Sequence, residues 1–368
     1  MAQWQLEESG LAQLIELLKA EGFDVVGPKV ENQVISYGLL DSVTDLPVGL
    51  TDVATPGSYK LLASESPTWF GYNLGSTTWR RFFDPPKRKL WTAQRTQQGF
   101  TVEPNTESTR PLAVFGARSC ELAALARQDE IYLEGETVDT YYQSQRSRCV
   151  IIAVNCSKAS ANCFCTSTDS GPTASTGFDL CLTELMAPKH VFLVSSGSDK
   201  GEALLAKLDK QPVSQGQLTQ AKKQEAGTIA QMGHAISKET WQQLTLVDLD
   251  NSWWQDVADT CLSCGNCTLS CPTCFCSTVE DTTDLSGNIA ERWQQWDSCF
   301  TGNFSYIHGG EVRHSTKSRY RQWFTHKLIN WQEQFEQTGC VGCGRCITWC
   351  PVGIDLREGI QQLTQEKV

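Results

Sequence analysis

Apolar residues in the first part of the chain follow two periods, one helical and one extended. Between Leu11 and Ala20 they recur at helical spacing, and Gly22 ends the pattern, which predicts a helix. Residues Val25 to Leu40 then read as strands broken at Gly27-Pro28 and at Glu31-Asn32, where turn-forming residues interrupt the apolar run. A helix followed by short strands is the expected start of a mixed α/β fold.

Three continuous apolar runs further along have the length of buried strands. They lie at Pro111–Ala117, Val150–Val154 and His190–Val194. Residues Glu121–Arg127, between the first two, have helical composition. Strands separated by helices favour a mostly parallel sheet covered by helices. The pattern therefore predicts an α/β domain over residues 1–248, whose chemically distinctive part is residues 110–185.

The remainder of the chain reads as helical. Residues 196–249 are polar and rich in Lys, Gln, Ala and Glu, which suits a connection between two domains. Helices are expected at Leu204–Leu208, Ala221–Ile236, Ile289–Phe300, Ser318–Phe335 and Asp355–Gln365. We therefore expect a second, α-helical domain over residues 249–368.

Two cysteine runs in that second domain share the spacing C-x2-C-x2-C-x3-C-P. The first is Cys261, Cys264, Cys267 and Cys271, and the second is Cys340, Cys343, Cys346 and Cys350. In bacterial ferredoxins with this spacing, the fourth cysteine of each run binds the cluster of the other run. We therefore expect one 4Fe-4S cluster on Cys261, Cys264, Cys267 and Cys350, and another on Cys340, Cys343, Cys346 and Cys271. The second domain would then be a two-cluster ferredoxin-like domain with a long insertion between its motifs.

Zinc and disulfides are the alternatives for these runs. Structural zinc usually takes two CxxC pairs and would leave the third cysteine of each run unused. Disulfides need an oxidising compartment, whereas the sequence starts MAQWQLEESG, without the basic, apolar or twin-arginine features of an export signal. The expectation is a cytoplasmic iron-sulfur protein.

Composition excludes several other classes. The 368 residues include 17 cysteines and carry a net charge of −11, with a pI near 5.0. An acidic chain disfavours nucleic acid as a partner, because nucleic acid needs a basic surface. No apolar stretch approaches the ~20 residues that span a bilayer. No GxGxxG follows a strand and no P-loop is present, so neither a Rossmann dinucleotide site nor ATP-driven chemistry has support.

Four further cysteines fall within the α/β part. Cys120 follows the strand that ends in FGAR, Cys156 follows VIIAVN, and Cys163 and Cys165 lie in NCFC. The carboxyl ends of parallel strands share one edge of a sheet, where ligands gather. The four thiolates could therefore hold a third 4Fe-4S cluster. The alternative is that they are small buried apolar residues.

Five cysteines remain outside these sets. Cys149 and Cys181 lie in apolar segments and are expected to pack in the core. Cys274, Cys276 and Cys299 could pack near a cluster, or hold a further cluster together with a ligand that is not cysteine. Packing near a cluster is the favoured interpretation for these three.

Several of the motifs together resemble one family. The segments FGARSCELAAL, NCSKASANCFCTSTDSGPTASTGFDLCLTEL, CLSCGNCTLSCPTCFC and CVGCGRCITWCPVGID occur in this order between Pro111 and Ile354. They resemble the iron-sulfur β subunit of cytoplasmic nickel-iron sulfhydrogenases, and the iron-sulfur A subunit of anaerobic sulfite reductases is similar too. One departure is TSTDSGP, where the family pattern has Ser-Met-Gly-Thr-Gly-Pro. The first hundred residues carry little of the resemblance.

The resemblance implies an electron-transfer subunit of a larger complex. Its partners would be a flavoprotein subunit linked to NAD(P)H and the small and large subunits of a nickel-iron hydrogenase, or a sirohaem subunit in the sulfite reductase alternative. The eight ferredoxin-type cysteines match the family's cluster ligands, and Cys120, Cys156, Cys163 and Cys165 match cysteines of its N-terminal half. A freestanding redox enzyme with its own flavin or substrate site is the third alternative. We expect no catalytic residue in this chain.

Overall fold

The N-terminal part is built on one eight-stranded sheet. The computed structural model describes residues 4–105, 110–233 and 235–365. The order of strands across the sheet is β12-β1-β11-β10-β9-β8-β2-β3. Their bounds are β1 Trp4–Leu6, β2 Asp24–Glu31, β3 Val34–Leu39, β8 Leu112–Ala117, β9 Val150–Val154, β10 Leu180–Leu185, β11 Val191–Ser196 and β12 Gln211–Pro212.

The centre of this sheet is parallel and its flanks are antiparallel. Strands β2, β8, β9 and β10 run parallel to their neighbours in that series, and β8 and β9 are buried at every position. The pairs β2·β3, β10·β11, β1·β11 and β1·β12 are antiparallel. The prediction of a mostly parallel sheet is therefore wrong at the edges, where short connections join β2 to β3 and β10 to β11 without a crossover helix, and β1 pairs with the distant β11 and β12.

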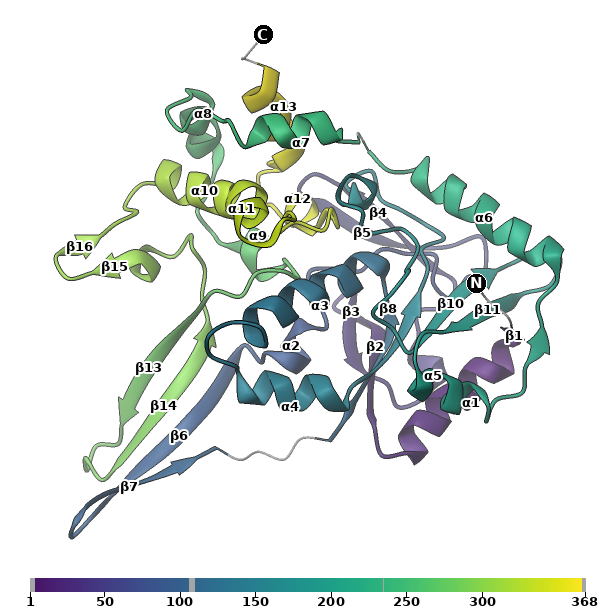
Figure 1. The fold of residues 1–368 in the computed structure, drawn as a ribbon, viewed down its shortest axis with the longest axis horizontal. Helices are drawn as coiled ribbons and strands as arrows, with labels where there is room; N and C mark the ends of the chain where they lie inside the picture. The colour runs from purple at the N-terminus through teal and green to yellow at the C-terminus, as the bar shows by residue number, and fades with distance from the viewer. Residues whose placement is uncertain (1–3, 106–109, 234, 366–368) are drawn as a thin grey trace.

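Helices of the N-terminal part cover this sheet, and helices of the C-terminal part lie mostly above it in the view of Figure 1. Their bounds in the N-terminal part are α1 Glu8–Ala20, α2 Arg80–Phe83, α3 Ser119–Tyr132, α4 Thr140–Arg148, α5 Asp199–Leu205 and α6 Gln215–Ile229. Those in the C-terminal part are α7 Lys238–Leu244, α8 Trp253–Thr260, α9 Asn266–Leu269, α10 Thr316–Thr325, α11 Trp331–Phe335, α12 Arg345–Thr348 and α13 Leu356–Gln365. No helix in the described ranges is long and apolar enough to cross a membrane.

Helix α1 shows how the sequence pattern produces this packing. Leu11, Leu14, Ile15 and Leu18 recur at helical spacing and are all fully buried in the main core. One face of α1 thus covers the sheet, while Lys19 in the last turn remains exposed and lies at the negative end of the helix dipole. The predicted helix at Leu11–Ala20 is confirmed.

The break predicted at Gly27-Pro28 is wrong, because both residues lie inside β2. The pairing of β2 with β8 ends at Val26, whereas the pairing with β3 continues past Pro28 to Glu31. A proline is tolerated in a strand where one neighbour has already ended, since no ladder bond is then lost on that side. The break at Glu31-Asn32 is confirmed, and Asn32 and Gln33 turn the chain with positive φ.

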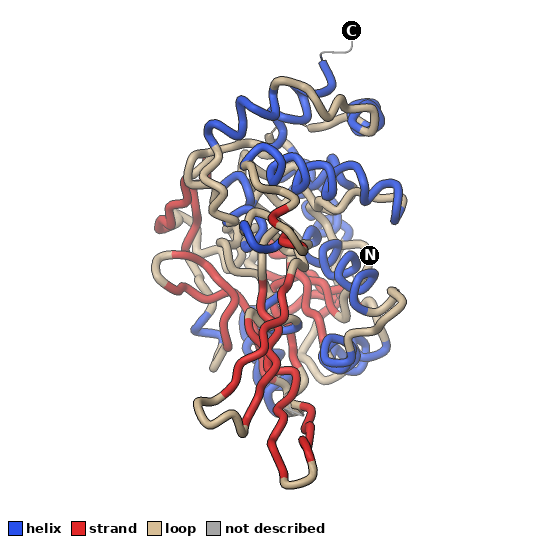
Figure 2. The backbone as a smooth tube through the Cα atoms, turned by 90° about the vertical axis from the view of Figure 1, so that its left-hand side faces the viewer, coloured by secondary structure: helices blue, strands red, loops and turns tan. Residues whose placement is uncertain are grey.

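A second, four-stranded sheet projects from the body as a long arm (Figures 1 and 2). Its order is β13-β14-β6-β7, with bounds β6 Lys87–Thr96, β7 Gly99–Pro104, β13 Ser277–Thr283 and β14 Ile289–Trp296. The helix predicted at Ile289–Phe300 is therefore wrong. Ile289, Trp293 and Trp296 have helical spacing, but the turn at Asp284–Asn288 folds β14 back onto β13, and β6 pairs with its other edge.

This sheet also joins the two parts of the chain, because β6 precedes residue 248 and β14 follows it. The cysteine-rich part is consequently mixed rather than purely α-helical. Two short hairpins complete the strands, β4 Leu50–Thr55 with β5 Ser58–Ala63, and β15 Tyr306–Ile307 with β16 Gly310–Glu311.

The long helix predicted at Ser318–Phe335 is present as three consecutive segments. Helix α10 continues into one π-helical turn, His326–Asn330 (η4), and then into α11. Trp254 from α8 and Phe324 and Leu328 from this long helix form a second core with Ile347 and Ile360. The long helix thus holds the second cysteine motif against the rest of the C-terminal part.

Candidate metal centres

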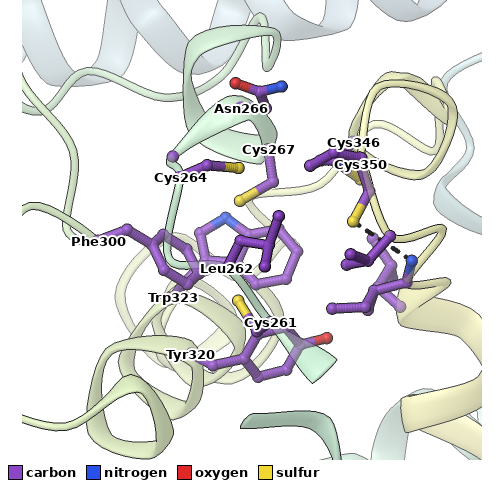
Figure 3. Close-up of a pocket in the computed structure, with 15 residues that line it drawn as sticks. Cys261, Leu262, Cys264, Asn266, Cys267, Phe300, Tyr320, Trp323, Cys346 and Cys350 are labelled. Carbon is purple, nitrogen blue, oxygen red and sulfur yellow. Dashed lines mark hydrogen bonds between the residues drawn. The ribbon is translucent and has the colours of Figure 1, made fainter. Parts of the chain in front are cut away.

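The first cysteine run and the last cysteine of the second run line one cavity (Figure 3). Cys261, Cys264, Cys267 and Cys350 surround it, and Cys346 lies at its edge. The loop between α8 and α9 supplies Cys261 and Cys264, α9 supplies Cys267, and Cys350 lies two residues after the end of α12.

 Cys350 lies 79 positions after Cys271, the last cysteine of the first run, so only the fold brings it to this cavity.

Polar atoms in this cavity fit an iron-sulfur cluster. Tyr320 Oη and Trp323 Nε1 line it, are buried, and have no hydrogen-bond partner. A buried donor without an acceptor is costly, and cluster or thiolate sulfur would supply that acceptor. Two backbone N–H groups already donate to thiol sulfurs, Ser263 N to Cys261 Sγ at 3.4 Å and Ile354 N to Cys350 Sγ at 3.3 Å. Such bonds to sulfur are among the features that set a cluster's potential.

The second set is Cys271, Cys340, Cys343 and Cys346, which lie within electrostatic reach of one another. Burial raises the pKa of Cys346 well above its usual value, and the neighbouring Cys340, Cys343 and Cys271 raise it further. Gly342 N donates to Cys340 Sγ at 3.4 Å, as Ser263 N does to Cys261 in the first set. The structure therefore brings the fourth cysteine of the first run to the first three of the second.

The four cysteines of the α/β part line another cavity. Cys120, Cys156, Cys163 and Cys165 surround it, and Cys343 of the second set forms part of its wall. Tyr72 Oη and Arg345 Nη1 lie in the same lining, buried and without a partner. The donor set and the unpaired polar atoms fit a cluster here too.

The loop of Cys163 and Cys165 is held directly against the second motif. Phe164 N donates to the Gly342 carbonyl at 2.8 Å, and Asn162 Nδ2 donates to Thr348 Oγ1 at 2.8 Å. A Cβ on Gly344, whose φ is +72°, would lie 2.3 Å from the Asn162 carbonyl oxygen. Only glycine permits this approach, which keeps the second and third sets adjacent.

We predict that Gly344→Ala destabilises the protein more than Gly287→Ala. Both residues have left-handed φ, +72° and +69°, but a Cβ on Gly287 would meet nothing within 4 Å. The left-handed conformation costs alanine about 1–2 kcal/mol at either position, so any excess loss at Gly344 comes from the contact with Asn162. Thermal unfolding of the two variants measures the difference, and equal shifts would show that the approach does not contribute.

Burial keeps the thiols of Cys163 and Cys340 neutral when no metal is bound. Burial raises the pKa of Cys163 and of Cys340 to about 12. Because iron binds the thiolate, loading of these sites must release protons. Among the described residues no three His, Cys, Asp or Glu side chains converge closely enough for a single metal ion. The thiols of the first and third sets stand instead around cavities, as the larger iron-sulfur cubane requires.

Buried cations accompany the thiols. Arg118, Arg127, Lys327 and Arg345 are each at most 8% exposed, and they act electrostatically on Cys156, Cys340, Cys271 and Cys343 respectively. Buried cations need anionic partners. A cluster bound by four thiolates is anionic, so this arrangement suits loaded sites.

The remaining cysteines fall into two groups. Cys149 and Cys181 are buried in the main core, in agreement with the packing prediction. Cys274 lowers the pKa of the neighbouring Cys271, and Cys299 lowers that of Cys276. The structure thus places Cys274 beside a predicted ligand, which is the favoured interpretation from the sequence.

Sequence reasoning missed the polar side chains around the thiols. Tyr72, Tyr320 and Arg118 carry no motif that could have identified them. Lys327 did carry a signal, because it lies three residues after Phe324 and four before Trp331, on the apolar face of the predicted helix. Arg345 stands inside the second motif, but the motif alone does not show where its guanidinium points.

Comparisons with known proteins agree with an iron-sulfur domain in the C-terminal part. Residues 260–354 match the family model for a 4Fe-4S dicluster domain. The chain is 28% identical over 291 residues to sulfhydrogenase 2 subunit beta of Pyrococcus furiosus, covering 76% of this chain and 83% of that protein. No solved structure matches. The resemblance to sulfhydrogenase β subunits that the sequence motifs suggested is confirmed, and the C-terminal part is a ferredoxin-type 4Fe-4S domain.

Proposed function

We propose that this chain carries three 4Fe-4S clusters. The first is held by Cys261, Cys264, Cys267 and Cys350, the second by Cys271, Cys340, Cys343 and Cys346, and the third by Cys120, Cys156, Cys163 and Cys165. Thiolate ligands are supplied by two parts of the chain, an α/β part over residues 1–248 and a ferredoxin-like part over residues 249–368. Free thiols and clusters of this kind suit a reducing compartment, in agreement with a cytoplasmic location.

We infer that the three clusters form a relay with the second in the middle. The observation that carries this proposal is that cysteines of the second set line the cavities of the other two sets: Cys346 lines the cavity of the first set, and Cys343 lines that of the third. Neighbouring cavities of this kind bring redox centres close together. At one end of the relay Cys264 is exposed, whereas Cys165 in the third set is buried, so the first cluster lies nearest to the surface.

The proposed activity is electron transfer inside a larger complex. The similarity to a sulfhydrogenase β subunit supports a relay between a flavoprotein subunit linked to NAD(P)H and the small and large subunits of a nickel-iron hydrogenase. The chemistry that the clusters supply when bound is one-electron transfer. The residues of this chain hold the clusters, exclude water from them and donate hydrogen bonds to their sulfurs.

A complex purified through a tag on this chain tests the proposal. We expect flavin, nickel and iron to co-purify, and Cys346→Ala to lower NAD(P)H-driven hydrogen evolution at least tenfold while dye-linked hydrogenase activity is retained. Cys149→Ala, a core cysteine outside the three sets, is the matched control. A complex with sirohaem in place of nickel would assign the chain to a sulfite reductase. Unaided turnover by the isolated chain, with a bound flavin, would contradict a relay role.

A further inference from the structure

We propose that Lys327 is a positioning residue for the second cluster, which it holds at a higher reduction potential through its contact with Cys271. This inference rests on the proposed function, because it presupposes that Cys271 binds a cluster. Lys327 belongs to the long helix between the two cysteine motifs, so the proposal also assigns a role to that insertion.

The surroundings of Lys327 are unusual for a lysine. Its side chain is buried, with 8% exposed, and its ammonium group has three acceptors. Nζ lies 3.4 Å from Cys271 Sγ, 2.8 Å from Thr273 Oγ1 and 3.5 Å from the Gly339 carbonyl oxygen. None of these three is a carboxylate. A buried ammonium needs a compensating negative charge, and the thiolate of Cys271 with its cluster is the group in position to supply it.

The same side chain joins the two halves of the ligand set. Cys271 ends the first motif, and Gly339 directly precedes Cys340 in the second. Thr273 Oγ1 donates to the Gly339 carbonyl at 2.7 Å, and Gly339 N donates to the Lys327 carbonyl at 2.8 Å. Lys327 therefore fixes the position of Cys271 relative to Cys340 through both its side chain and its backbone.

The local helix geometry places the ammonium group at this junction. Lys327 lies in the π-helical turn η4, between α10 and α11. A π-helical turn carries an extra residue relative to an α-helix, and such turns occur frequently at functional sites. The neighbouring Leu328 and Ile329 are buried in the second core, so the turn is held in place by packing.

A fixed positive charge beside a cluster ligand favours the reduced cluster. Reduction adds a negative charge, and hydrogen bonds and charge near the sulfurs are the main controls on cluster potential. Because the second cluster occupies the middle of the proposed relay, its potential decides how readily electrons pass between the other two.

Redox titration of Lys327→Met, followed by EPR, tests the proposal. We expect full iron content and one cluster whose reduced-to-oxidised ratio at a fixed potential falls at least tenfold, which is 59 mV for a one-electron couple. Lys317→Met, on the preceding helix, should leave all potentials unchanged. Lys327→Arg, which keeps the charge and a hydrogen-bond donor, should keep the potential of that cluster close to the wild-type value.

Each of the other outcomes either supports or overturns the role proposed for Lys327. Full iron with unchanged potentials in Lys327→Met overturns the role of Lys327 and leaves the clusters in place. Loss of about four irons in Lys327→Met, recovered in Lys327→Arg, supports the positioning role. Loss of all iron in both variants overturns it in favour of a general role in folding. A wild-type protein without iron contradicts the proposed function itself.

Discussion

Cys350→Ala removes the cluster of the first motif and leaves the cluster of its own motif intact. The structure places Cys350 on the first cavity with Cys261 and Cys267, whereas Cys346, one helical turn earlier, belongs to the second set. The cluster loses one of its four ligands, so we expect a loss of about four irons per chain. Iron analysis and reduced-state EPR measure the loss.

Double variants show which cysteines share a cluster. Cys350→Ala with Cys261→Ala should lose no more iron than either single variant, because both ligands serve one cluster. Cys350→Ala with Cys340→Ala should lose about eight irons, since two clusters are affected. The opposite pattern would mean that each motif binds its own cluster without exchange of the fourth ligand. Cys149→Ala, which removes a core thiol, should retain all iron.

The second large effect, a loss of stability, is expected for Arg345→Met. Arg345 Nη2 lies 2.7 Å from Glu121 Oε1, and the two side chains are 6% and 0% exposed. Glu121 also accepts hydrogen bonds from Tyr37 Oη at 2.7 Å and Arg118 N at 3.1 Å. Removing the arginine leaves a buried carboxylate without its cation, which costs about 3–5 kcal/mol of the free energy of unfolding.

An exposed ion pair with the same N–O distance provides the control for Arg345. Arg292 Nη2 lies 2.7 Å from Asp281 Oδ2 on the projecting sheet, with side chains 42% and 54% exposed. Solvent screens such a pair, so Arg292→Met should change the unfolding temperature little. The double variant Arg345→Met/Glu121→Gln should recover part of the loss, because it removes the uncompensated carboxylate. Equal losses of stability in Arg345→Met and Arg292→Met would show that burial does not increase the cost of removing the arginine.

The elements that the sequence predicted well are those whose pattern is local. Helix α1 and strands β8 and β9 follow from apolar spacing alone, because a helix buries one stripe and a central parallel strand is buried on both faces. Strand β14 was missed because Ile289, Trp293 and Trp296 imitate helical spacing. Only its pairing with the distant β6 decides its conformation, and a single sequence does not show that partner.

The thiol sets were predictable to a different degree. Regular spacing and the two prolines grouped the eight ferredoxin-type cysteines, and the strand ends grouped Cys120 and Cys156. The juxtaposition of the second and third sets was not predictable, since it depends on Gly344 packing against Asn162. Nor were Tyr72 and Tyr320 predictable as polar neighbours of the thiols, because their positions follow from tertiary packing.

Iron and acid-labile sulfide per chain, measured on anaerobically purified protein together with reduced-state EPR, test the central claim most directly. Three clusters predict about twelve irons and an equal amount of sulfide, with interacting EPR signals from neighbouring centres. About eight irons would leave only the ferredoxin-type pair and remove the third set from the relay. Zinc in place of iron would contradict the electron-transfer account altogether.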